Sequence, residues 1–166
     1  MSIVNVKDDE ETIMKGMQAF VKARCNQCHV VAGHGINLGP ELTDVAKRFK
    51  GEKLVQQILD PSSEINKKFQ NHQFVLKSGK LVAGVIVQES AAEFKVVTNL
   101  LNPNAFVRVN RKEIEEQIPS KISAMPNGLA NVLTKAEILD MVSFLEFGGY
   151  KLPAHLKHSH DHSGND

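Results

Sequence analysis

The five residues Cys25-Asn26-Gln27-Cys28-His29 limit most strongly what this chain can be. They contain both cysteines of the 166-residue sequence. Because no third thiol can pair with them, a framework of structural disulfides is excluded, apart from a bond between Cys25 and Cys28 themselves. An amphipathic helical pattern precedes the motif, and a loop rich in Gly and Pro follows it. The motif therefore joins a predicted helix to a predicted loop.

The spacing C-x-x-C-H is the attachment signature of c-type haem. Two thiols three positions apart can reach the two vinyl groups on one side of a porphyrin, and the adjacent histidine can ligate the iron. We therefore predict one covalently bound haem c, attached through Cys25 and Cys28 and ligated by His29. Two alternatives stay open. Zinc would need a fourth ligand, for which His34 is the only nearby candidate. A thioredoxin-type pair would need a strand before the first cysteine, where the sequence predicts a helix.

Pro40 is predicted to help hold this site. A metal-bound histidine needs a partner for its second ring nitrogen, and a backbone carbonyl is a common one. In cytochromes c, which this motif resembles, the partner is the carbonyl of a proline in the loop after the motif. Gly39-Pro40 lies where such a loop would be, so the resemblance implies Pro40 as the partner of His29. Pro40 would equally suit the start of a helix.

Met125 is the predicted second axial ligand of the iron. It lies in an irregular segment, residues 123–128, where a following proline can hold it rigidly. Methionine is a soft ligand that raises the potential of a haem. Alternatively, the side chain of Met125 has no role toward haem and fills a gap under the loop. The other candidates are histidines, or methionines at predicted core positions of helices: His34, His72, Met14, Met17 and Met141.

The remaining pattern is helices, then strands, then a helix. The spacing of apolar residues predicts helices over 9–24, 42–49 and 54–59, the last ended by Pro61. Runs rich in Val, Ile and Phe predict a small antiparallel sheet or barrel. The final helix begins with a capping box, Thr134 to Glu137, and ends at Gly148-Gly149.

Several motifs together resemble class I cytochromes c. They are C-N-Q-C-H at 25–29, G-P-E-L-T-D-V-A-K-R-F at 39–49, I-L-D-P-S-S-E-I-N at 58–66, S-A-M-P-N-G-L at 123–129 and L-T-K-A-E-I-L-D at 133–140. More specifically, they resemble the haem-binding (CxxCH) domains at the C-terminal ends of large planctomycete proteins. The resemblance covers about residues 10–147. It implies an α-helical haem fold, iron ligation by His29 and Met125, and electron transfer outside the cytoplasm.

We therefore expect a mainly α chain, in which a cytochrome c haem fold is interrupted by a β insertion. The haem domain is expected over 9–70 and 119–150, and the insertion over 71–118. The segment L-K-S-G-K-L-V-A-G-V-I-V at 76–87 resembles a small Sm-like or SH3-like barrel. The insertion would either shield the haem edge or dock a partner. The His-rich tail, 151–166, is expected to be disordered, and its alternating histidines could bind a transition metal.

The predicted function is that of a mono-haem electron carrier, not an enzyme, with redox proteins as partners. The alternatives are a haem-based gas sensor in which Met125 is displaced and, more weakly, a peroxidase. A net charge of +1 and the lack of a basic-aromatic surface argue against nucleic acid. An exposed edge of the β block is where a homodimer would form.

The expected location is the periplasm or another compartment outside the cytoplasmic membrane. No stretch approaches the roughly 20 apolar residues of a membrane helix. Residues 1–14 contain no apolar run typical of a signal peptide. Attachment of haem outside the membrane would therefore require that a leader has been removed.

Overall fold

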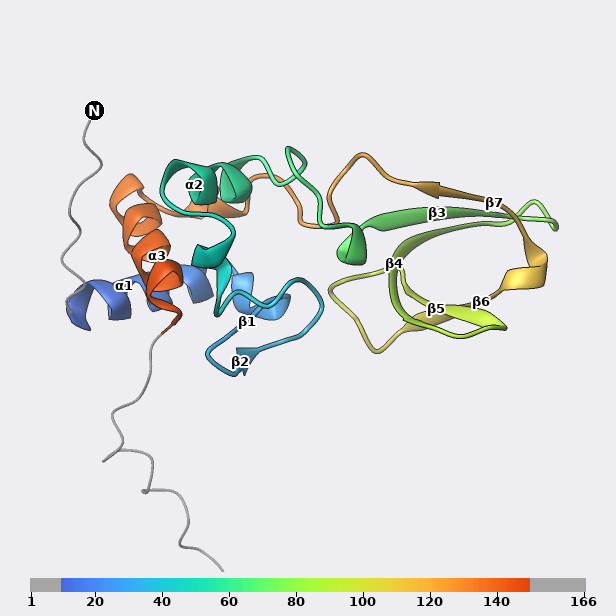
Figure 1. The fold of residues 1–166 in the computed structure, drawn as a ribbon, viewed down its shortest axis with the longest axis horizontal. Coiled ribbons are helices and arrows are strands. Elements are labelled where there is room, and N and C mark those ends of the chain that lie inside the picture. The colour runs from blue at the N-terminus through green and yellow to red at the C-terminus, as the bar shows by residue number, and fades with distance from the viewer. Residues whose placement is uncertain (1–9, 150–166) are drawn as a thin grey trace, which may run out of the picture.

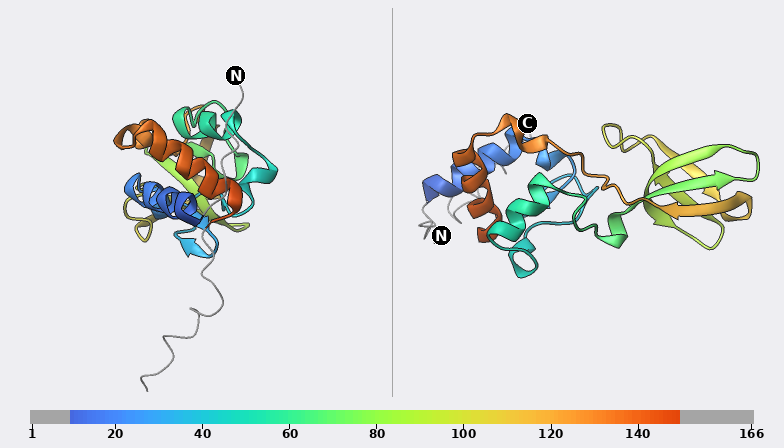
Figure 2. Two further views of the ribbon diagram at one scale, coloured as in Figure 1. Left: turned by 90° about the vertical axis from the view of Figure 1, so that its left-hand side faces the viewer. Right: turned by 90° about the horizontal axis from the view of Figure 1, so that it is seen from above.

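The computed structural model describes residues 10–149, which form a helical part and a sheet part placed end to end (Figures 1 and 2). Helices, with 3-10 turns included, hold about 36% of the described residues, and strands hold about 25%. The chain therefore combines helices with a substantial sheet, rather than being mainly α as the sequence predicts. The expected His-rich tail, 151–166, lies outside the described residues.

The helical part is built on the packing of α1 (Glu10–Lys22) against α3 (Lys135–Phe147). The rings of Phe20 and Phe144 lie 5.6 Å apart between the two helices. A Cβ atom at Gly16 would overlap the backbone carbonyl of Asp140, so the absence of a side chain lets the helices approach closely. This contact forms the centre of the first hydrophobic core.

The ends of α3 agree with the sequence prediction. The hydroxyl of Thr134 accepts a hydrogen bond from the backbone N–H of Glu137, whose carboxylate accepts one from the N–H of Thr134 at 2.8 Å. The predicted capping box is thus confirmed. Gly148 ends the helix with a φ of 86°, a left-handed conformation that glycine adopts without strain.

A short helix and a hairpin connect α1 to the sheet. Helix α2 (Glu52–Leu59) ends before Pro61, as predicted. The hairpin consists of β1 (Val30–Val31) and β2 (His34–Gly35). The helix predicted over 42–49 is reduced to one 3-10 turn, Val45–Lys47. The N–H of Leu42 donates to the carbonyl of Val30, so the start of this segment is tied to the hairpin.

The helical methionines differ in burial. Met141 is 1% exposed and belongs to the core, as predicted, whereas Met14 is 40% exposed. The core prediction for Met14 is therefore wrong, because this residue lies on the outer side of α1.

Five antiparallel strands form the sheet in the order β6-β5-β4-β3-β7. The bounds are β3 Asn71–Leu76, β4 Leu81–Glu89, β5 Glu93–Val97, β6 Phe106–Asn110 and β7 Ile114–Pro119. The sheet curls around its own core (Figure 1), and the rings of Phe74 and Phe94 lie 5.4 Å apart although β4 separates their strands. The curl stops short of closure, because β6 and β7 remain edges. The sequence predicts a small sheet or barrel, and the structure shows an open sheet.

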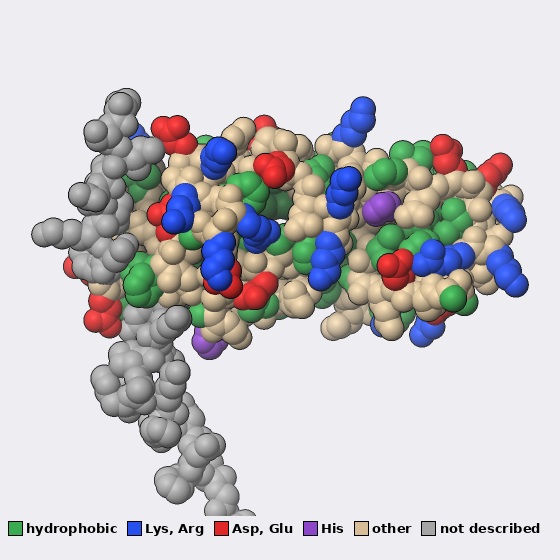
Figure 3. Space-filling view, viewed as in Figure 1, with side chains coloured by type: hydrophobic (Ala, Val, Ile, Leu, Met, Phe, Trp, Pro, Cys, Tyr) green, Lys and Arg blue, Asp and Glu red, His purple; other side chains and the backbone are tan. Residues whose placement is uncertain are grey.

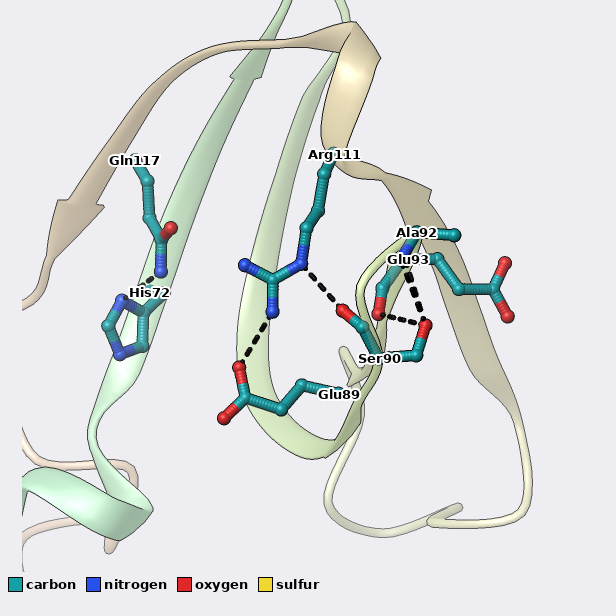
Figure 4. Close-up of polar contacts among 7 residues, drawn as sticks. All are labelled: His72, Glu89, Ser90, Ala92, Glu93, Arg111 and Gln117. Atoms are coloured by element: carbon teal, nitrogen blue, oxygen red, sulfur yellow. Dashed lines mark hydrogen bonds and ion pairs between the residues drawn. The ribbon is translucent and has the colours of Figure 1, made fainter.

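Arg111, just after β6, ties the ends of three strands together (Figure 4). Its guanidinium is 2.8 Å from the carboxylate of Glu89 and donates from Nε to the carbonyl of Ser90 at 2.8 Å. The same group lies 4.0 Å above the ring of Phe94. These contacts fix the turn between β4 and β5 against the end of β6.

Within residues 10–149, no helix is long and apolar enough to cross a membrane.

Candidate functional site

An apolar cavity of about 350 Å³ lies in the helical part and reaches the sheet. Its walls come from α1, the cysteine motif, the loop after the hairpin, α2, the segment before α3, and α3 itself. In the space-filling view, hydrophobic side chains flanked by Lys and Arg show where the two parts meet (Figure 3). The structure brings together, in the lining of this one cavity, all the residues that the sequence predicts for the site: Cys25, Cys28, His29, Pro40 and Met125.

The backbone at the end of α1 aims both cysteines into the cavity. Arg24 adopts a left-handed conformation with a φ of 60°, which ends the helix and turns the chain. A single 3-10 turn follows, Cys25–Gln27, with Cys25 accepting hydrogen bonds from the N–H groups of Cys28 and His29. Side chains at positions i and i+3 of such a turn lie on the same side. Both sulfur atoms can therefore face one edge of a flat ligand.

His29 is held by one hydrogen bond to the backbone. Its Nδ1 lies 2.7 Å from the carbonyl oxygen of Pro40, and because a carbonyl only accepts, Nδ1 carries the proton. The lone pair of the neutral ring then resides on Nε2. Burial lowers the pKa of His29, while its hydrogen bond to Pro40 opposes that shift. The imidazole is thus kept in the neutral form that can ligate a metal.

Two glycines let the loop pack closely on this histidine. A Cβ atom at Gly39 would lie 2.8 Å from Cε1 and 3.0 Å from Nδ1 of the His29 ring. Gly35 has a φ of 119°, and a Cβ there would overlap the carbonyl oxygen of His29. The N–H of Gly39 also donates to the carbonyl of Cys28 at 2.6 Å. The loop therefore positions the ring through its backbone.

Met125 is half-buried and reaches the cavity from the segment before α3. Its N–H donates to the hydroxyl of Ser123 at 3.1 Å, and the N–H of Ser123 donates to the hydroxyl of Ser62 at 3.0 Å. Ser62 follows α2, so one hydrogen bond ties the methionine segment to the chain after that helix, and the other braces the segment internally. An irregular segment held in this way can present a thioether at a fixed place.

Comparison with known families supports this arrangement. Residues 13–78 match the model of the family described as Cytochrome c. Residues 13–78 are therefore similar to a cytochrome c domain. In the matched family, haem transfers electrons between redox partners. The matched residues include the cysteine motif and Pro40, whereas Met125 lies outside them. Comparison with curated proteins gives no match.

The chemistry of this cavity suits haem. Haem is a flat apolar ring, and most of the lining is apolar. Burial raises the pKa of the Cys25 thiol to about 11 and also raises the pKa of Cys28. Both sulfurs are therefore protonated thiols at neutral pH. The thiols, the imidazole and the thioether line the same space, so the residues present fit a covalently bound haem.

The rival histidines lie away from this cavity. His34 is exposed on β2, and His72 lies on β3 with its Nδ1 3.2 Å from the side-chain amide of Gln117 (Figure 4). Neither residue is part of the cavity lining. In the part of the chain that the structure describes, no group of three or more His, Cys, Asp or Glu side chains could hold a metal ion.

Sequence reasoning did not find the residues that complete the cavity wall. Arg24 and Arg48 belong to the lining, and Val85 and Leu100 reach it from the sheet. Leu100 meets residues from the N-terminal half of the chain only because of how the sheet is placed against the helices, and a local sequence pattern does not reveal that placement.

Proposed function

We propose that this chain is a mono-haem c-type cytochrome that transfers single electrons between redox proteins. The observation that carries the proposal is the convergence of four potential haem contacts in one apolar cavity. They are the thiols of Cys25 and Cys28, the imidazole of His29 and the thioether of Met125. A zinc site or a thioredoxin-type pair would not need the methionine or the large apolar wall.

The cysteines provide the covalent attachment in this account. Each S–H adds across one vinyl double bond: sulfur bonds one carbon, the hydrogen is transferred to the other, and no oxidant is consumed. The 3-10 turn after Arg24 places the two thiols on the same side for this reaction.

His29 and Met125 would hold the iron, His29 through an imidazole nitrogen and Met125 through its thioether sulfur. Nε2 of His29 offers its lone pair because Nδ1 is engaged by the Pro40 carbonyl. The sulfur of Met125 would occupy the second position, and a methionine ligand favours a higher potential. When bound, haem supplies the one-electron couple of its iron. Two fixed side-chain ligands keep the coordination unchanged between the two oxidation states, which suits a carrier.

The charged groups at the rim suit the periphery of haem. Arg24 and Arg48 line the cavity, and Arg48 donates to the backbone carbonyl of Glu41 at 3.3 Å. Haem carries two carboxylates, which are well matched by two guanidinium groups. We assign these arginines to the carboxylate edge of haem.

The cellular setting follows from the chemistry. Cytochromes of the c type are typically extracytoplasmic, and we propose the periplasm as the location of this chain. The likeness of its motifs to the planctomycete haem-binding domains leads us to propose that it works as an electron-transfer domain of that kind.

Attachment can be tested by expressing the chain together with haem-attachment machinery. We expect a mass increase of one haem, which stays with the protein after denaturation in acidified organic solvent. Cys25→Ala and Cys28→Ala should each retain haem through one thioether bond, and the double variant should lose it on denaturation. Haem that leaves the parent protein under these conditions would contradict covalent attachment.

Carbon monoxide separates a carrier from a gas sensor. With Met125 bound, the reduced protein should resist carbon monoxide at neutral pH. Rapid binding would instead favour a sensor in which the methionine is displaced. The same measurement on Met125→Ala provides the positive control, because that variant has an open position.

A further inference from the structure

The loop between β5 and β6, residues 98–105, brings the sheet to the haem cavity. Leu100 from this loop lines the cavity together with Val85 of β4. In Figure 1 the loop extends from the sheet toward the hairpin of the helical part. Residues 71–119, which lie between Pro40 and Met125 in sequence, thus supply part of the cavity wall.

Leu100 and its neighbour have opposite environments. Leu101 is 82% exposed, the highest value among the exposed large hydrophobic residues. Leu100 is half-buried and lines the cavity, so it lies at the boundary between the cavity and solvent. Two leucines of identical chemistry, adjacent in one loop, therefore differ in whether they cover the cavity.

Hydrogen bonds within the loop fix this difference. The side chain of Asn99 accepts a hydrogen bond from the N–H of Leu101 at 2.9 Å. The backbone carbonyl of Asn99 accepts from Asn102 at 3.0 Å, and that of Asn102 accepts from Ala105 at 3.1 Å. At the base of the loop, the ammonium group of Lys95 lies 3.7 Å from the centre of the Phe106 ring. Two consecutive turns on a braced base give Leu100 a defined place.

We propose that Leu100 closes the haem cavity on the side of the sheet and limits the access of water and small ligands to the iron. The inference rests on the proposed function, since it takes haem to be the occupant. A leucine side chain at the opening excludes water from the haem edge, and a drier haem environment is one of the factors that set its potential. The sheet thereby acts as a positioning element for an apolar cover.

The test compares Leu100→Ser with Leu101→Ser in the haem-loaded protein. The probe is imidazole, which competes with Met125 for ferric iron. We expect imidazole to displace Met125 about fivefold faster in Leu100→Ser than in the parent. Removing one half-buried leucine from the opening should lower the barrier to entry by an amount that corresponds to less than a tenfold change in rate. The midpoint potential should also fall in this variant. Leu101→Ser should match the parent in both measurements.

Two further variants keep the result interpretable. Leu100→Met conserves volume and apolar character and should restore slow displacement, whereas Leu100→Ala should change the rate in the same direction as serine. The unfolding midpoints of all variants should agree, which separates loss of cover from loss of structure. Equal imidazole rates and potentials for Leu100→Ser and Leu101→Ser would overturn the inference. A parent protein without Met–iron coordination would instead refute the proposed function.

Discussion

Substitution of Gly39 by alanine tests how the loop positions His29. The added Cβ would lie 2.8 Å from Cε1 and 3.0 Å from Nδ1 of the ring, and real Cβ contacts essentially never come closer than 3.0 Å. Carbon atoms pack best at about 3.5–4.0 Å, so the ring or the loop must move by roughly 0.7 Å. Because φ at Gly39 is not positive, the effect is steric rather than conformational.

The displacement has two costs. Forcing an extra methyl group into a packed site costs about 1–3 kcal/mol. If the ring moves away from Pro40 by the same amount, the hydrogen bond of 2.7 Å reaches about 3.4 Å and is largely lost. Loss of such a partner typically weakens a metal–histidine bond by about 10–100-fold. We therefore expect Gly39→Ala to lower the unfolding free energy of the haem-loaded protein by about 2 kcal/mol.

The assay is guanidinium unfolding followed by haem absorption. Gly33→Asn is the matched control, because a Cβ at Gly33 meets nothing within 4 Å and asparagine tolerates its positive φ of 82°. The control should stay within about 0.5 kcal/mol of the parent. An unchanged midpoint and spectrum for Gly39→Ala would refute the view that the backbone of this loop holds His29.

Three further predictions concern other parts of the chain. Gly84→Ala would place a Cβ on a backbone carbonyl of the paired strand β5 and should destabilise the sheet by about 2–3 kcal/mol, measured by urea unfolding and circular dichroism. The side-chain hydrogen bond from Lys22, followed by the hydrogen bond from the backbone of Thr134, lowers the pKa of Glu137. The stability that this pairing contributes is therefore present above the unfolded-state pKa and is lost as pH falls through the folded-state pKa. Lys22→Gln should reduce this loss of stability in acid, measured as unfolding midpoints against pH, and a pH profile identical to that of the parent would contradict the pairing. Burial is the main reason that the pKa of Cys25 is raised to about 11, with a smaller contribution from Cys28. In haem-free Cys28→Ser, the midpoint of Cys25 alkylation should therefore stay above the ordinary thiol value of about 9, whereas a midpoint near 9 would show that the thiol is not buried.

Local patterns predicted the features that depend on neighbours in sequence. The cysteine motif, the end of α2 at Pro61 and the capping box at Thr134 are set by spacing and by backbone chemistry within a few residues. The five predicted site residues also line one cavity. Their roles toward haem remain predictions.

Features that depend on distant contacts were not predictable in the same way. The 42–49 segment has helical spacing, yet the bond from Leu42 to Val30 in the hairpin limits it to a single turn. An alternating apolar pattern predicts strands, but whether β6 and β7 meet to close a barrel depends on the curl of the whole sheet. The place of Leu100 in the cavity wall likewise depends on how the sheet lies against the helices.

The absorption spectrum of the oxidised, haem-loaded protein tests the central claim most directly, with Met125→Ala and Met141→Leu as the pair of variants. Both methionines line the cavity, but Met141 is 1% exposed and belongs to the core. We predict that the oxidised protein has a weak long-wavelength absorption band, which marks Met–iron bonding. The band should persist in Met141→Leu and disappear in Met125→Ala. A high-spin spectrum without this band in the parent, or a band that survives in Met125→Ala, would contradict ligation by His29 and Met125.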